Sequence, residues 1–210
     1  AWAASAGHAL RPGMLATVAE RALADQHWHA VVDVAELAQD LAPCRAGEDV
    51  VALARIHLYA ALAMRFVPDP GRAHLQLDRV EGLLATASPA EADDLRTRVR
   101  IIRADLLHYA HGEPDAALRA LSPGLHEPTD ARLDGHALLH LIYSGRHREA
   151  RDILATEPDL RRHAPTGLRD RIAVAETLML AASGSPARAL REATQFASRP
   201  EDSAKRRLVT

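Results

Sequence analysis

Apolar side chains recur along most of the chain at spacings of three and four residues, which is the period of an amphipathic helix. Glycines, prolines and capping side chains interrupt this pattern at intervals of 10 to 20 residues or so, as they do where helices begin and end. The pattern predicts ten helices in five pairs, with a short turn inside each pair. The expected ranges are 12–24, 28–42, 49–66, 71–86, 90–110, 115–122, 131–144, 147–156, 167–183 and 187–197.

The expected helix ends carry residues with a clear structural role. A capping side chain directly precedes a proline at three helix starts: Asp69-Pro70, Ser88-Pro89 and Ser185-Pro186. Ser88 is also followed three residues later by Glu91, which predicts a reciprocal capping box. Three expected helices are each followed by a glycine, the residue that most easily adopts the left-handed conformation of a helix end: Gly112, Gly145 and Gly184.

The helix pairs repeat. Each of these turn glycines is followed five residues later by an alanine, namely Ala117, Ala150 and Ala189, and looser copies place Ala73 after Pro68 and Val31 after Gln26. A small residue at this position lets the second helix of a pair lie close against the first. The five small positions are 42, 44, 33 and 39 residues apart, and such a period with two helices per unit indicates an α-solenoid.

The turn motif Gly-x-x-x-x-Ala, with Leu121 or Leu154 four residues further on, resembles the tetratricopeptide repeat. The segment 22–38 (ALADQHWHAVVDVAELA) and the longer spacing resemble the repeat domains of large bacterial LuxR-type regulators related to the maltose activator, which belong to the signal-transducing ATPase class. The large aromatic of the first helix is replaced here by Ile101, Asp134 and Ala173. The resemblance implies an all-α, right-handed solenoid of about five hairpins, a single tetratricopeptide-like domain over residues 1–210. The expected repeats are 9–42, 49–87, 90–122, 131–156 and 167–197.

Composition supports a helical fold and restricts the environment. Ala occurs 43 times and Leu 29 times, whereas aromatic residues make up 3% of the chain, too few for a sheet-rich fold. No apolar run approaches the ~20 residues of a membrane helix, so no membrane partner is expected. The start shows no signal peptide, and Cys44 is the only cysteine, which together predict a cytoplasmic protein. The missing initiator Met suggests a piece of a longer protein.

Charge and missing residue types exclude several activities. The net charge of −2 argues against direct nucleic-acid binding, which needs a positive excess to displace counterions from phosphates. Asn is absent and Lys205 is the only lysine, which excludes a phosphate-loop lysine and a Schiff-base lysine in a core. There is no nucleophile elbow and no dinucleotide fingerprint. We therefore expect no catalytic residues, no cofactor and no enzymatic activity.

The inner face of the predicted solenoid is the expected binding surface. In the tetratricopeptide register this face carries a ladder of Arg, Tyr and His side chains suited to a carboxylate, phosphate or peptide backbone. The expected groove residues are Arg55, Tyr59, Arg65, Arg103, Tyr109, Arg132, His136, Tyr143 and Arg171. The alternative is that the arginines are solvated or paired with neighbouring acids and that the tyrosines complete the core. Repeat domains that clamp C-terminal carboxylates use Asn and Lys, so that activity is not expected.

Two further clusters have a structural interpretation. His136 and His140 are four residues apart and could chelate a metal with Asp134 or His147, but on a Leu-rich helix one of the pair more often packs in the core. We therefore predict no metal site. The basic run Arg96, Arg98, Arg100 and Arg103 follows Glu91, Asp93 and Asp94, and we expect these charges to pair along the helix.

The most concrete functional reading follows from the regulator resemblance. It implies a non-catalytic sensor module that presents a concave groove to a small-molecule inducer or a partner protein and relays binding to ATPase and DNA-binding parts outside this chain. An alternative is a stand-alone adaptor that holds a peptide or helix of a partner protein. A third hypothesis is an enzyme that uses His136 and His140 with a metal.

Overall fold

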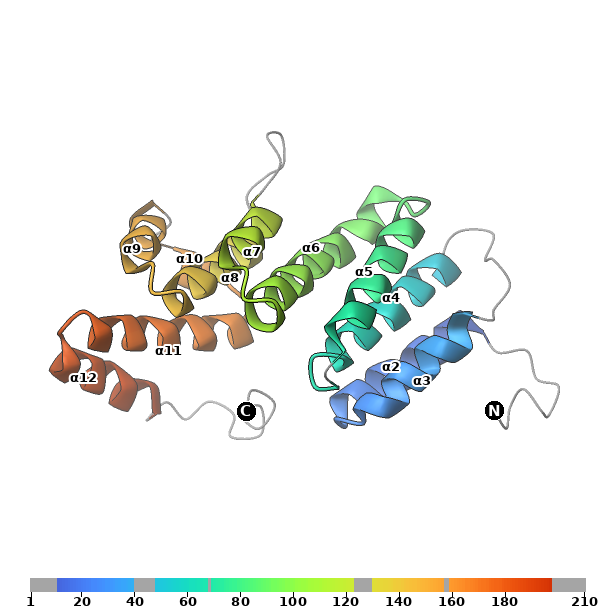
Figure 1. Ribbon diagram of the computed structural model, residues 1–210, viewed down its shortest axis with the longest axis horizontal. Coiled ribbons are helices and arrows are strands. Elements are labelled where there is room, and N and C mark those ends of the chain that lie inside the picture. Colours follow the sequence, from blue (N-terminus) through green and yellow to red (C-terminus); the bar gives the residue numbers. More distant parts are fainter. Residues whose placement is uncertain (1–10, 40–47, 68, 123–129, 157–158, 198–210) are drawn as a thin grey trace. The chain divides into compact units, whose positions relative to one another are not determined.

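The computed structural model describes residues 11–39, 48–67, 69–122, 130–156 and 159–197. Within these ranges every regular element is a helix, and there is no strand (Figure 1). The chain divides into two compact units, Ala1–Gly112 and Glu113–Thr210. None of the described helices is both long enough and apolar enough to cross a membrane.

Unit 1 is built of two helix hairpins and a third long helix that ends in a π-helical turn. Its elements are α2 (Pro12–Ala24), α3 (Trp28–Gln39), α4 (Glu48–Ala63), α5 (Pro70–Leu84), α6 (Pro89–Asp105) and η1 (Leu106–Ala110). Helix α4 contacts α2, α3, α5 and α6, and it is apolar around most of its circumference. A helix that is hydrophobic all round is buried at the centre of its domain, which is the place of α4 in unit 1.

Unit 2 is also organised around one central helix. Its elements are α7 (Pro114–Leu121), α8 (Ala131–Tyr143), α9 (His147–Thr156), α10 (Leu160–His163), α11 (Thr166–Ala182) and α12 (Pro186–Ala197). Helix α8 contacts α7, α9, α10 and α11, and α12 packs on α11. Gly135 makes the contact with α11 close, because a Cβ atom there would lie 2.8 Å from Cδ2 of Leu168.

The predicted helices are confirmed, with shifts of a few residues at their ends. The helix expected over 90–110 is α-helical only to Asp105 and continues as the π-helix η1. The short helix α10 was not predicted, because four residues carry too little periodicity to detect. Residues 40–42 of the second predicted helix lie outside the described residues, as do Cys44 and Lys205.

The predicted turn glycines are confirmed by their backbone. Gly112, Gly145 and Gly184 have φ angles of 70°, 74° and 78°, the left-handed conformation in which glycine has no Cβ penalty. Gln26 adopts φ 60° at the equivalent turn between α2 and α3. The His27 amide donates to the carbonyl of Ala22, and the Gln26 amide donates to the carbonyl of Leu23. These are the two hydrogen bonds of a Schellman motif, and they form here although Gln26 carries a side chain.

The small residues five positions after each turn are buried at the helix contacts, as predicted. Ala73, Ala117 and Ala150 have exposed fractions of 0%, Val31 of 0% and Ala189 of 5%. Four of these positions belong to helices that pack on the preceding helix of their pair, namely α3, α5, α9 and α12. The paired helices can therefore approach closely because the side chains at these positions are small.

The capping predictions have a mixed outcome. The Asp69 carboxylate accepts a hydrogen bond from the Arg72 amide at 3.0 Å, as expected for the cap of α5. Ser88 occupies the position before α6, but its side chain makes no capping hydrogen bond, so this half of the predicted capping box is wrong. Pro89 at the first helical position already sets the backbone angle there, so α6 begins without that bond.

Candidate functional site

Helices α2 and α6 both pack against the central helix α4 of unit 1. Tyr59 of α4 is 9% exposed. Burial raises the pKa of its phenol, and the charge of Glu20 on α2 adds to this, while Arg98 and Arg55 act in the opposite direction. The hydroxyl therefore stays protonated at neutral pH and can both donate and accept a hydrogen bond.

The predicted groove residues Arg55 and Tyr59 thus share one face of α4, four residues apart. Arg55 is exposed and forms no ion pair within the described part of the chain. Its guanidinium is available to a carboxylate or phosphate on this face. Tyr59 belongs to the buried core of unit 1, as the alternative interpretation of the tyrosines expects, whereas Arg55 is exposed.

A pocket of about 450 Å³ lies where α4 ends, α5 begins and η1 follows α6. It includes two of the predicted groove residues, Arg65 and Tyr109. Most of the other lining residues are apolar. The full set is Met64, Arg65, Phe66, Pro70, Asp105, Leu106, Tyr109 and Ala110. This combination of an apolar wall with a few convergent polar groups, at a volume between 300 and 1,000 Å³ or so, is typical of small-molecule sites.

The polar end of this pocket, which we call the η1 pocket, is an ion pair between Arg65 and Asp105. The guanidinium Nη1 lies 2.9 Å from Oδ2 of the carboxylate. The Asp105 side chain is 1% exposed and the Arg65 side chain 32% exposed. The carboxylate is therefore neutralised inside the fold, whereas part of the guanidinium still faces the pocket. Removal of Arg65 would leave a buried charge, at a cost of about 3–5 kcal/mol.

The π-helical geometry of η1 shapes the same pocket. The His111 amide donates to the carbonyl of Leu106 at 3.2 Å, an i to i+5 bond that widens the turn. Tyr109 on this turn is 49% exposed and packs against His108 with ring centroids 4.5 Å apart. Isolated π turns are rare and often occur at functional sites, because the widened turn changes the direction of the side chains after it.

Aromatic packing supports the other side of the η1 pocket. Phe66 follows the end of α4 and stacks on Trp28 of α3, with ring centroids 4.2 Å apart and an angle of 12° between the rings. Phe66 is still 62% exposed. The stack therefore holds one apolar wall of the pocket in place while leaving the other face of the Phe66 ring accessible.

Other arginines of the predicted ladder are engaged with neighbouring acids. Arg103 pairs with Asp78 and Glu81 of α5, at 2.8 and 3.3 Å, and so projects toward α5. Within unit 2, Arg132 pairs with Asp130, whose carboxylate also accepts from the Arg132 amide at the start of α8. Arg103 and Arg132 are therefore paired with neighbouring acids, which is the alternative to a role in the groove.

The remaining predicted residues lie on α8 and α11. Tyr143 ends α8 and is 42% exposed, and Arg171 on α11 is half-buried without an ion pair in the described part of the chain. Two arginines of the basic run on α6 pair along the helix as expected, since Arg96 contacts Asp93 at 3.1 Å and Arg98 contacts Asp94 at 2.9 Å. Arg103 of the same run pairs with α5 instead.

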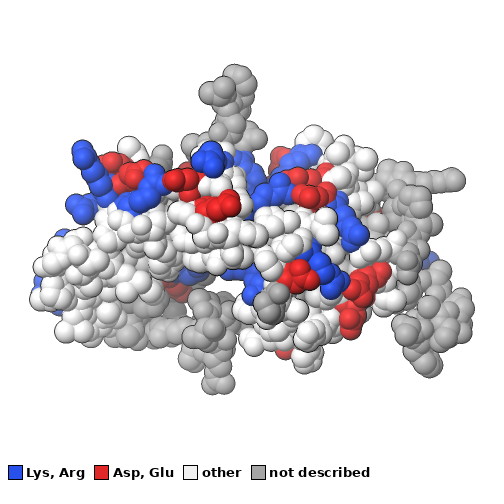
Figure 2. All heavy atoms as spheres, viewed as in Figure 1, with Lys and Arg blue, Asp and Glu red and all other residues white. Residues whose placement is uncertain are grey.

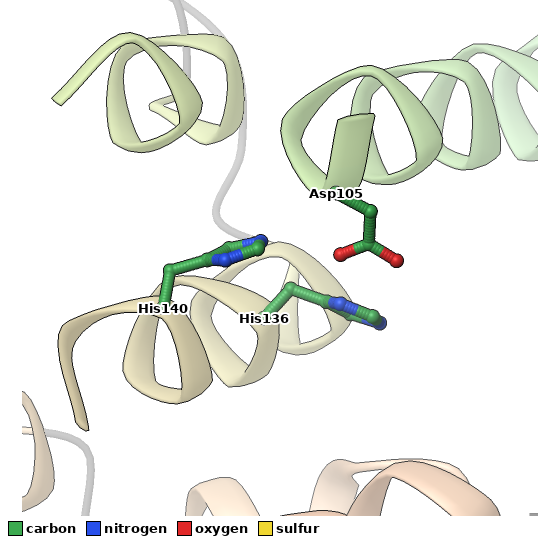
Figure 3. Close-up of side chains that lie close together, drawn as sticks. All are labelled: Asp105, His136 and His140. Carbon is green, nitrogen blue, oxygen red and sulfur yellow. The ribbon is translucent and has the colours of Figure 1, made fainter. Parts of the chain in front are cut away.

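His136 and His140 are buried one turn apart on α8, and both side chains project from the same side of the helix (Figure 3). One ring nitrogen of each lies within 4.8 Å of the other, so the pair could supply two ligands to a metal. Among the described residues, neither Asp134 nor His147 joins the pair within that distance. Asp105, also drawn in Figure 3, belongs to unit 1, where it pairs with Arg65.

No family model, curated protein or solved structure matches this chain. The candidate site is therefore defined only by the geometry of the described residues.

Positive and negative side chains are mixed on the molecular surface. Arginine and acidic side chains lie among one another over the face shown in Figure 2 and do not gather by sign.

Sequence reasoning identified part of the η1 pocket and missed the rest. Arg65 and Tyr109 were singled out from the repeat register, but Asp105, Phe66 and Pro70 were not. Asp105 is one of several acidic residues of α6, and only its ion pair with Arg65 distinguishes it from the others. A π turn has no signature in the apolar spacing of 90–110, so no signal in the sequence predicted the pocket itself.

Proposed function

We propose that this chain is a non-catalytic binding module built of helical hairpins of the tetratricopeptide type, and that the η1 pocket receives a small-molecule ligand. The observation that carries the proposal is the pocket of about 450 Å³ in which a fixed Arg65–Asp105 ion pair lies beside apolar and aromatic walls. Such a pocket favours a ligand with a flat apolar body and one polar group.

The helix arrangement supports a hairpin-repeat module. In unit 1 each hairpin packs on the next, and the first helices of successive hairpins, α2, α4 and α6, also pack in sequence. In unit 2 the first helices α8 and α11 pack in the same way. Contacts confined to neighbouring repeats are a property of solenoids, in which a ligand can change the angle between adjacent repeats at a small cost in free energy.

The biological setting follows from the resemblance of segment 22–38 to LuxR-type regulators. In this setting the chain is the sensor of a bacterial transcriptional regulator, and its ligand is the inducer. The buried small residues at the turns, such as Ala73 and Ala150, are consistent with the repeat type from which this setting is inferred.

A ligand-observed NMR screen tests the proposed function. The full chain would be screened against a library of small aromatic carboxylates and amines, and Tyr109→Ala would be compared with Tyr143→Ala. Both tyrosines are exposed, but only Tyr109 lines the η1 pocket. We expect hits that lose their saturation-transfer signal in Tyr109→Ala and keep it in Tyr143→Ala. A library without hits, or hits unaffected by Tyr109→Ala, would contradict the η1 pocket as the site.

A further inference from the structure

Unit 2 contains a second pocket, larger than the η1 pocket and separate from it in sequence. It measures about 520 Å³ and lies between α9, α10, α11 and α12, open to solvent on one side. Its apolar lining is formed by Leu154, Ala173, Met179 and Leu180. Its charged lining includes Arg188, Glu192 and the buried Glu176.

Most of the polar side chains in this pocket already bind within the protein. Arg162 forms an ion pair with Asp159 at 3.0 Å, and the Arg169 guanidinium donates to the carbonyl of Ala164 at 3.3 Å. The Thr177 hydroxyl donates to the carbonyl of Ala173 at 2.9 Å. These groups build the walls and are committed to the fold.

Arg188 and Glu192 differ from these groups. Both lie on α12, four residues apart, and both line the pocket, yet neither forms an ion pair or side-chain hydrogen bond within the described part of the chain. On a helix a Glu that precedes its basic partner by four residues pairs better than one that follows it. The order Arg188 then Glu192 is the weaker one, and both a guanidinium and a carboxylate remain available to a ligand in the pocket.

The charge and size of the pocket restrict its ligand. A dianion such as phosphate would meet the carboxylates of Glu176 and Glu192, and a simple cation would meet the guanidinium groups of Arg169 and Arg188. A molecule with a carboxylate and an ammonium group on neighbouring atoms matches both side chains at once. Leu154, Ala173, Met179 and Leu180 add an apolar wall beside them.

We propose that this pocket binds a free α-amino acid with an apolar side chain, whose carboxylate pairs with Arg188 and whose ammonium group pairs with Glu192. The apolar side chain of the ligand lies against the wall formed by α9 and α11. The site is independent of the η1 pocket, because none of its lining residues belongs to unit 1.

Isothermal titration calorimetry on the full chain tests this proposal, with L-leucine, L-methionine and L-phenylalanine as probes. We expect one site per chain for at least one probe, with a Kd below about 1 mM. Arg188→Gln and Glu192→Gln should each weaken binding about tenfold or more, because each removes one charge-assisted contact. Both changes lie on exposed or half-buried positions and should leave the fold intact.

The matched control is Arg191→Gln, which removes an exposed arginine of the same helix that does not line the pocket. Binding should be unchanged in this variant and in Tyr109→Ala, which separates this proposal from the η1 pocket. N-acetyl-L-leucine, which lacks the ammonium group, and L-leucinamide, which lacks the carboxylate, should each bind about tenfold more weakly than L-leucine.

Three results would overturn the proposal. The first is the absence of saturable heat for all three amino acids up to about 10 mM. The second is equal affinity for L-leucine and its N-acetyl derivative, which would leave Glu192 without a role. The third is a loss of affinity in Arg191→Gln as large as that in Arg188→Gln, which would indicate general charge attraction.

Discussion

Individual residues at the turns carry a measurable part of the stability of this fold. The helix pairs turn through one residue in the left-handed conformation, and glycine occupies it at Gly145 and Gly184, whereas Gln26 occupies it between α2 and α3. For a residue with a Cβ atom this conformation costs about 1–2 kcal/mol. The strain at Gln26 is tolerated because both Schellman hydrogen bonds form and α3 packs on α2.

Gln26→Gly should therefore stabilise the protein by about 1 kcal/mol, since glycine removes the Cβ strain at this turn. The reverse change, Gly145→Ala, should destabilise it by a similar amount. No atom lies within 4 Å of a Cβ at Gly145, so that penalty is purely conformational. Urea unfolding of both variants measures the two shifts. A Gln26→Gly variant less stable than the wild type would show that the glutamine side chain has a structural role of its own.

The buried histidine His57 makes the free energy of unfolding depend on pH. His57 is 5% exposed, and its Nδ1 donates to Oε1 of Gln76 at 2.6 Å. Burial lowers the pKa of His57 below 6.5, although the hydrogen bond that His57 donates to Gln76 acts in the opposite direction. The native state therefore binds fewer protons than the unfolded state below about pH 6.5, and stability falls as the pH is lowered.

His57→Gln should reduce this pH dependence, because glutamine can donate to Gln76 and carries no charge at any pH. The free energy of unfolding of the wild type should fall more between pH 7.5 and pH 5.5 than that of the variant. Paired denaturant titrations at the two pH values measure the difference. Equal losses in both proteins would assign the pH dependence to other groups, such as His74, whose pKa is also lowered by burial and then by His111.

At the scale of elements, each unit is held by one central helix and by small residues where helices touch. Helix α4 has this role in unit 1 and α8 in unit 2. Gly135 is the tightest contact of α8, with three side-chain atoms of Leu168 and Ile172 between 2.8 and 3.2 Å from the position of a Cβ. Packing at this point has no spare volume.

Gly135→Ala should destabilise unit 2 by about 1–3 kcal/mol, because the added methyl group forces α8 and α11 apart. Gly82→Ala is the matched control, since Gly82 lies inside α5 and no atom is within 4 Å of its Cβ position. That change should stabilise the protein by up to about 1 kcal/mol through helix propensity alone. Thermal unfolding followed by circular dichroism measures both, and opposite signs are the expected outcome. A neutral Gly135→Ala would mean that Leu168 rotates away at little cost.

At the scale of the whole molecule, positive and negative charges are balanced. The net charge is −2, and ion pairs such as Arg72 with Glu36 and Arg146 with Asp115 join different segments of one unit. We therefore expect no binding to a 20-base-pair DNA duplex at about 0.1 M salt, where nonspecific affinity depends on an excess of cations. Fluorescence anisotropy checks this expectation. A Kd below about 10 µM that weakens steeply with salt would contradict it.

Local patterns in the sequence were sufficient to predict the helices, their turns and the small residues at their contacts. These features depend on interactions within a few residues, such as the proline at Pro70, the cap at Asp69 and the left-handed glycine at Gly145. The same local rules failed at Ser88 and at the π turn η1. The spacing of four residues also placed Arg55 and Tyr59 on one side of α4.

The partners of the charged side chains and the positions of the pockets depend on how the helices pack. Arg103 and Arg65 were both expected in the groove, yet Arg103 pairs with acids of α5 and Arg65 with the buried Asp105. Likewise, Arg188 and Glu192 become a candidate site only because α9, α10 and α11 enclose the space beside them. A pocket is formed by side chains distant in sequence, and local periodicity contains no information about which of them meet.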